Sequence, residues 1–163
     1  MRTRKGFTLI EIVIYTAIAS MMLISMVLIT QSLYQTRARV RSAIILEENM
    51  RHAMARIIIS IRESEGVAVP GIHSTGTYLS LAMPNPTIDP TQFDLVDGTI
   101  VQTSGVGSGI PITSPQVEIT DLEFTRSSTT IPLVFVEMSG QLRNVVGAYQ
   151  SELTLSNSAT IRR

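Results

Sequence analysis

Glu11 is the residue whose type and position most clearly indicate chemistry. It is the only charged side chain between Lys5 and Arg37, and it precedes 25 uncharged residues at positions 12–36. A carboxylate in an apolar helix costs ~2.5–3.5 kcal/mol at the centre of a bilayer, and less near its surface. Glu11 therefore needs a cationic partner wherever that helix packs away from water. The alternative is that Glu11 extends to water as an ordinary charge at a helix end.

The residues before Glu11 form a short basic segment. Arg2, Arg4 and Lys5 are followed by Gly6, and no acidic residue lies among them. Basic residues next to an apolar span favour the cytoplasmic side of a membrane. The other end of the span is also basic, so this rule alone is nearly balanced; its arginines are Arg37, Arg39 and Arg41.

Three aspartates lie close together in the second half of the chain: Asp89, Asp94 and Asp97. Loop carboxylates can bind calcium, but their spacing does not match a 12-residue calcium loop. Asp97 is explained by the turn that Asp97-Gly98 favours, and Asp89 by its place before Pro90. Calcium at these three residues remains an alternative to a chain without cofactors.

The rest of the sequence contains few residues that could form a catalytic site. The chain has no cysteine and two histidines, so thiolate and His-based metal or nucleophile sites have few candidates. The glycine-rich run 105–109 lacks the lysine of a phosphate-binding loop. Asp121 and Glu123 lie on one face of a predicted strand and could be read as a carboxylate pair for acid–base chemistry. An exposed strand face explains the pair more simply. We expect a protein that is not an enzyme and that holds no cofactor.

The apolar run predicts a membrane-spanning helix over residues 7–36, after a leader at 1–6. Its 25 uncharged residues span roughly 38 Å as a helix, enough to cross a hydrocarbon core of ~30 Å. Residues 37–65 continue the helix with an amphipathic pattern. The apolar residues recur every three or four positions and predict a contact with the rest of the protein: Ala43, Leu46, Met50, Ala53, Met54, Ile57 and Ile61. Gly66 and Pro70 are expected to end the helix.

The composition changes at residue 66. Residues 66–163 contain nine of the ten glycines and all seven prolines, and predict a β-rich domain. Asp97-Gly98 predicts a hairpin. A slip in the alternation near Asp121 predicts a bulge. We expect an α+β protein whose long helix packs on an antiparallel sheet with strands at 77–82, 92–97, 99–103, 116–126, 131–138 and 145–156. This region has a net charge of −4, which argues against nucleic-acid binding because that would need a basic surface.

Residues Lys5-Gly6-Phe7-Thr8-Leu9-Ile10-Glu11, with the apolar run that follows, resemble the N-terminal signature of type IV prepilins and type II secretion pseudopilins. The resemblance is close over residues 2–34. Over the rest of the chain it extends only to the outline of a long helix followed by a β domain.

The resemblance implies cleavage after Gly6 by the prepilin peptidase and N-methylation of Phe7. The bare backbone of Gly6 suits an extended segment in a protease groove. It also implies that Glu11 pairs with the Phe7 amine of a neighbouring subunit. Four small residues would let helices approach one another, or are ordinary membrane-helix composition: Ala17, Ala19, Ser20 and Ser25.

The expected function is that of a structural subunit in a type IV pilus-like filament, for pilus biogenesis, type II secretion or DNA uptake. Its partners would be other pilin or pseudopilin subunits, the prepilin peptidase and an inner-membrane assembly platform. The helix lacks a proline near Leu28 and the chain lacks a disulfide, which favours a minor pilin or pseudopilin. Such a subunit is a single-pass inner-membrane protein with a cytoplasmic N-terminus before it joins the filament. The alternative is an unprocessed, membrane-anchored binding domain of the cell envelope.

Overall fold

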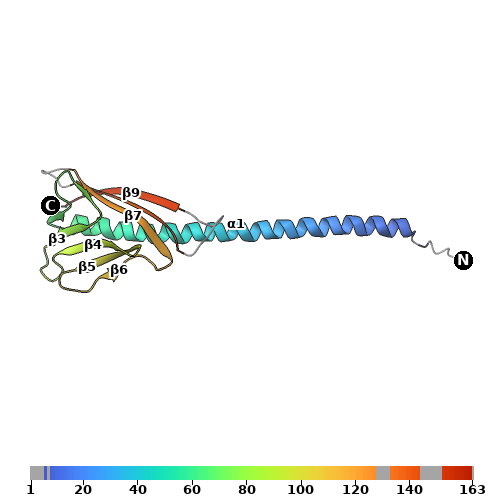
Figure 1. Cartoon of the computed structure of the whole chain (residues 1–163), viewed down its shortest axis with the longest axis horizontal. Coiled ribbons are helices and arrows are strands. Elements are labelled where there is room, and N and C mark those ends of the chain that lie inside the picture. Colours follow the sequence, from blue (N-terminus) through green and yellow to red (C-terminus); the bar gives the residue numbers. More distant parts are fainter. Residues whose placement is uncertain (1–5, 7, 128–132, 144–151, 163) are drawn as a thin grey trace. The chain divides into compact units, whose positions relative to one another are not determined.

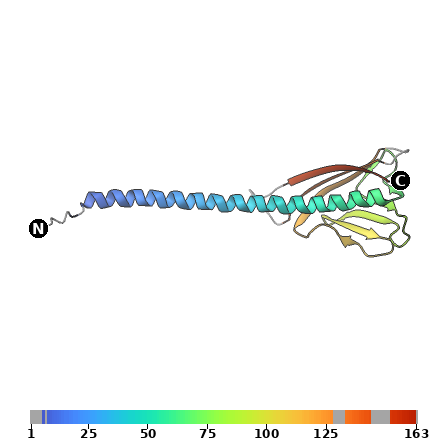
Figure 2. The same ribbon diagram turned by 180° about the vertical axis from the view of Figure 1, so that it is seen from behind.

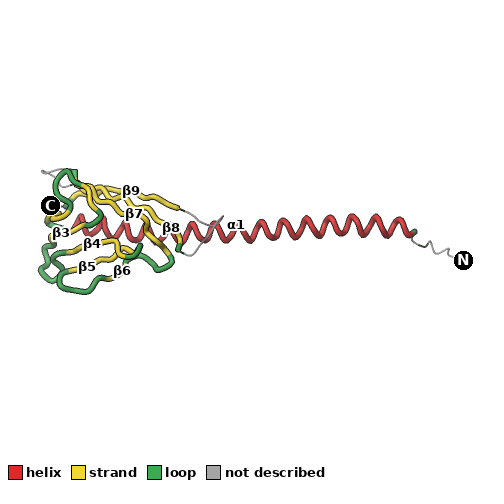
Figure 3. Tube along the Cα trace, viewed as in Figure 1, coloured by secondary structure: helices red, strands yellow, loops and turns green. Residues whose placement is uncertain are grey.

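A computed structural model describes residues 6, 8–127, 133–143 and 152–162. The chain divides into two compact units, Met1–Val40 and Arg41–Arg163, and each is described by itself. The first element, α1 (Leu9–Glu63), is a 55-residue helix that begins in the first unit and ends in the second (Figures 1 and 3). No glycine or proline occurs between residues 7 and 65, so nothing in the sequence interrupts the backbone hydrogen bonds of the helix.

In the first unit, α1 presents its side chains to the surroundings. Apart from the half-buried Glu11, every described residue up to Val40 is exposed. This part of α1 is long and apolar enough to cross a membrane. The structure therefore supports the expectation of a membrane-anchoring helix near the N-terminus.

In the second unit, one face of α1 is buried. The spacing of three and four predicted from the sequence is confirmed, and the face also includes Ile58 and Ser60. Ala43 is a correction: it is exposed, because the core encloses α1 only from Leu46 onward. The buried residues are Leu46, Met50, Ala53, Met54, Ile57, Ile58, Ser60 and Ile61.

Two antiparallel sheets pack around this face. The five-stranded sheet has the order β1-β3-β4-β5-β6, and the four-stranded sheet has the order β2-β7-β8-β9. The strands of the first are β1 (Gly66–Val69), β3 (Leu79–Ala82), β4 (Thr91–Val96), β5 (Thr99–Ser104) and β6 (Ile110–Pro111). Those of the second are β2 (Thr75–Gly76), β7 (Val117–Arg126), β8 (Leu133–Leu142) and β9 (Glu152–Thr160). Figures 1 and 2 show the two sheets on different sides of the end of α1.

Two local predictions for the β domain are confirmed. Asp97 and Gly98 have φ angles of 49° and 71° and join β4 to β5, as the hairpin requires. The register between β7 and β8 shifts between Ile119 and Asp121, where the alternation of the sequence slips.

The expected fold class, a long helix packed on an antiparallel β domain, is confirmed. The strands form two sheets rather than the single sheet expected, and several element limits differ from the prediction. β1, β2 and β6 are two to four residues long, too short for an alternating pattern to reveal them. Gly66 begins β1, and two residues separate it from the end of α1 at Glu63. The strand expected at 77–82 begins at Leu79, and the described part of the last strand runs to Thr160 rather than to 156. The start of the expected strand at 145–156 lies outside the described residues.

The Asp97-Gly98 turn also joins the two sheets. The Ile119 N–H donates to the Gly98 carbonyl at 2.8 Å, and Arg143 Nη2 donates to the Asp97 carbonyl at 2.7 Å. A Cβ on Gly98 would lie 2.9 Å from Glu118 Cγ, so this close approach requires glycine. The turn therefore helps to hold both sheets against α1.

Candidate functional site

The described part of the N-terminal motif is the start of α1. The Thr8 N–H donates to Glu11 Oε2 at 3.4 Å, and the Glu11 N–H donates to Thr8 Oγ1 at 3.4 Å. The Thr8 carbonyl also accepts from the backbone of Glu11 and Ile12, at 3.2 and 3.3 Å. This reciprocal arrangement is a capping box, in which the first and fourth residues satisfy N–H groups that the helix leaves free.

Sequence reasoning missed this role of Thr8 and Glu11. The signal was present, because Thr followed three residues later by Glu, directly before an apolar run, is typical of a helix N-terminus. The cap gives the Glu11 carboxylate a structural task within its own chain. It does not give the carboxylate a cation, since the ion pair found among the described residues joins Arg51 to Glu47 instead.

Gly6 lies just before the capped turn and is exposed. A Cβ built on Gly6 would meet no atom of the described residues within 4 Å. The other predicted residues of the motif lie outside the described residues, and their proximity to Glu11 stays a prediction: Arg2, Arg4, Lys5 and Phe7.

The hydroxyl groups of the apolar run bond to the helix itself. Ser20 Oγ donates to the Ala17 carbonyl at 2.8 Å, and Ser25 Oγ donates to the Met21 carbonyl at 2.9 Å. A hydroxyl satisfied in this way can face lipid or another helix without an unpaired polar group. Ser20 and Ser25 can therefore act as the small residues of a helix contact, although the role of these residues stays a prediction.

The three aspartates considered for calcium have local hydrogen-bonding roles. Asp89 Oδ1 accepts from the Met83 N–H at 2.9 Å, and Asp94 Oδ1 accepts from the Leu95 N–H at 2.8 Å. Asp97 occupies the hairpin turn. Within the described ranges, no group of three His, Cys, Asp or Glu residues could hold a metal ion. Whether these aspartates bind calcium stays a prediction.

Comparison with protein families decides what the N-terminal segment is. The model of the prokaryotic N-terminal methylation motif matches residues 1–27. Residues 1–27 are a prepilin-type methylation motif. The resemblance drawn from Lys5 to Glu11 is thus confirmed, and the match also covers the first part of the apolar run.

The prepilin-type motif covers a sixth of the chain and identifies that segment alone. No curated protein and no solved structure gives a significant match to this chain. The motif points to a processed structural subunit rather than to an enzyme. Membership of a minor class of subunit stays a prediction.

Proposed function

We propose that this chain is a subunit of a type IV pilus-like filament. It is cleaved after Gly6, methylated on Phe7 and joined to its neighbours through the first part of α1. The observation that carries the proposal is the prepilin-type motif at the start of a helix whose apolar side chains are left exposed up to Val40. Apolar surface on this scale needs lipid before assembly and other helices afterwards.

Glu11 has the part of a register-setting charge in this proposal. It has no cationic partner within the described residues, and its cap to Thr8 holds the carboxylate at the start of the helix. In a packed bundle, the methylated Phe7 amine of a neighbouring subunit would neutralise that carboxylate. A charge pair at low dielectric fixes the axial position of two helices more strongly than apolar contacts do.

The route to the filament follows from the same residues. Arg2, Arg4 and Lys5 would keep the leader on the cytoplasmic side, where the peptidase removes it. The β domain would then lie outside the cytoplasmic membrane, on the surface of the filament. The chain contains no nucleotide-binding motif, so assembly would depend on a platform protein and an ATPase supplied by the machine.

The mature N-terminus tests processing. The full chain would be produced with and without a prepilin peptidase, and its intact mass and N-terminal sequence determined. We expect a chain beginning with N-methylated Phe7 only when the peptidase is present. A chain that still begins at Met1, or that is cut beyond the helix near residue 36, would instead establish the membrane-anchored or secreted β domain.

The charge of Glu11 tests assembly. Glu11→Gln keeps an acceptor for the cap but removes the charge, so we expect membrane insertion to persist and incorporation into filaments to fall. The matched control is Glu48→Gln, an exposed carboxylate on the same helix. Equal incorporation of both variants would contradict the proposed pairing.

A further inference from the structure

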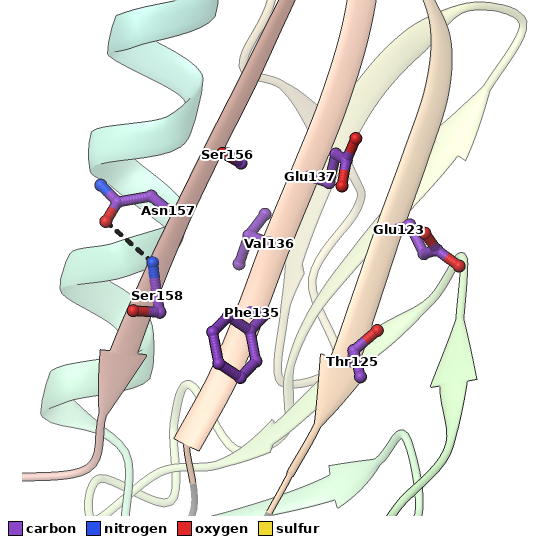
Figure 4. Close-up of a pocket in the computed structure, with 8 residues that line it drawn as sticks. All are labelled: Glu123, Thr125, Phe135, Val136, Glu137, Ser156, Asn157 and Ser158. Atoms are coloured by element: carbon purple, nitrogen blue, oxygen red, sulfur yellow. Dashed lines mark hydrogen bonds between the residues drawn. The ribbon is translucent and has the colours of Figure 1, made fainter.

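The outer face of the four-stranded sheet carries acidic side chains around one aromatic ring. Glu123 on β7 and Glu137 on β8 are direct cross-strand partners, and Asp121 lies opposite Ser139. Phe135, opposite Thr125, is 45% exposed. Figure 4 shows Glu123, Glu137 and Phe135 around a hollow that Ser156 of β9 also lines. We call Asp121, Glu123, Phe135 and Glu137 the acidic face.

The acidic face is unfavourable for the isolated chain. Like charges directly opposite one another on neighbouring strands repel, and no described residue forms an ion pair with Glu123 or Glu137. A half-exposed aromatic ring beside them adds apolar surface to the same spot. A surface with an apolar centre and charged surroundings has the composition of a protein contact.

A complementary surface lies on α1 where the helix borders β9. Arg51, Ala55, Ile59 and Arg62 follow one another at spacings of four, four and three, so they share one side of the helix. We call these four residues the basic ridge. All four are exposed, and Ile59 is 47% exposed.

The basic ridge borders a groove between α1 and β9. Its apolar walls come from Met54, Ile58, Ile59 and Leu155, with the two arginines at its ends. Arg51 already pairs with Glu47 at 2.7 Å, whereas Arg62 makes no ion pair within the described part of the chain. Of the two arginines in the basic ridge, Arg62 is therefore the one that can pair with a carboxylate of another molecule.

The two surfaces match each other in chemistry and in dimension. Phe135 and Glu137 are two residues apart on a strand, about 7 Å. Ile59 and Arg62 are three residues apart on a helix, about 4.5 Å, and the long arginine side chain can cover the difference. A ring placed against Ile59 in the groove would bring the Glu137 carboxylate towards Arg62.

We infer that the basic ridge of one copy of this chain binds the acidic face of a second copy. Phe135 of the second copy enters the groove between α1 and β9, and its Glu137 pairs with Arg62. Because the two surfaces differ, each copy can use its ridge on one neighbour and its acidic face on another, and such a head-to-tail contact can repeat along an open helical array. This inference rests on the proposed function, since a filament subunit requires such a repeating contact.

Disulfide trapping between two differently marked copies tests the contact. The chain has no cysteine, so introduced cysteines are the only thiols. One tagged full-length copy carries Ala55→Cys on the ridge, and a second carries Thr125→Cys beside Phe135. Both are produced in one membrane together with the peptidase and then oxidised. We expect a mixed disulfide-linked pair well above the level of Ala55→Cys with Asp94→Cys, an exposed position on β4 of the other sheet.

Charge reversal separates a specific contact from random collision. Arg62→Glu in the ridge copy should lower the mixed product about tenfold, and Glu137→Arg in the other copy should restore it. The positions are on the surface, so thermal unfolding of each variant should match the parent. A mixed product equal to that of the Asp94→Cys pair, or insensitive to Arg62→Glu, overturns the inference. So does trapping of the ridge copy by a different subunit.

The same samples distinguish failure of the contact from failure of the proposed function. Mature chains beginning at methylated Phe7 without the mixed product would overturn the contact and leave the filament function standing. A mixed product between chains that still begin at Met1 would support the contact and overturn the processing step.

Discussion

Similar apolar residues have opposite environments in the two halves of α1, which are the residues up to Val40 and those from Leu46 onward. Ile29 is 62% exposed, whereas Ile57 is fully buried. The difference comes from the partner: the two sheets cover α1 from Leu46 onward, and no described residue buries the part before Val40. Apolar composition therefore shows that the side chains of a helix need to be buried. Only the fold shows whether residues of the same chain bury them.

Polar side chains on the two halves differ in the same way. In the first half, Thr30 Oγ1 bonds to the Met26 carbonyl of its own helix at 2.8 Å. In the second half, Asn49 Oδ1 accepts from the Ser114 N–H at 3.2 Å, and Arg56 Nε donates to Gln102 Oε1 at 2.9 Å. The Thr30 hydroxyl is thus satisfied within its own helix, which suits a side chain that faces lipid. The second half ties the helix to the β domain.

The largest contrast should appear on shortening an isoleucine in each half. Ile57→Ala removes a fully buried side chain and should lower the free energy of unfolding by about 2–5 kcal/mol. Ile29→Ala removes the same atoms from an exposed site and should leave unfolding of the β domain unchanged. Chemical denaturation of the full chain in detergent micelles, followed by near-ultraviolet circular dichroism, measures both. A comparable loss in both variants would show that the first half also packs within the chain.

The sequence predicted the elements whose signals are local and repeated. The spacing from Leu46 to Ile61 located the buried face of α1, and Asp97-Gly98 located the hairpin. The division into two sheets could not be predicted in this way. It depends on which strand pairs with which, and the two-residue strand β2 joins β7, about fifty residues further along the chain.

The N-terminal motif could be predicted almost completely, because its signal is a set of residue types at fixed positions. The pattern around Gly6, Phe7 and Glu11 identified the motif, and the family match over residues 1–27 confirms it, while the roles of the three residues stay predictions. The acidic face could not be found from sequence alone. Glu123 and Glu137 are fourteen residues apart, and only the register of β7 and β8 places them side by side.

A smaller contrast is expected from removing one polar side chain in each half. Asn49→Ala leaves the Ser114 N–H without its acceptor and should cost about 1–3 kcal/mol of stability. Thr30→Ala removes a hydroxyl bonded within the helix and should cost nothing in the same unfolding experiment. Equal losses would indicate that the Asn49 bond does not hold the helix to the β domain.

The smallest effect is expected at the first turn of α1, and it should stay local. Thr8→Ala removes the side-chain half of the capping box and should weaken the first turn by about 1 kcal/mol. Thr8→Ser keeps the hydroxyl and should behave as the parent. Amide hydrogen exchange of Glu11 and Ile12 in micelles should quicken in the alanine variant alone, while unfolding of the β domain stays unchanged. Apart from Glu11, the described residues of the first half are exposed, so a lowered unfolding midpoint in Thr8→Ala would contradict the separation of the two halves. Unchanged exchange would instead show that the Thr8 hydroxyl does not cap the helix, and would leave Glu11 free of that structural task.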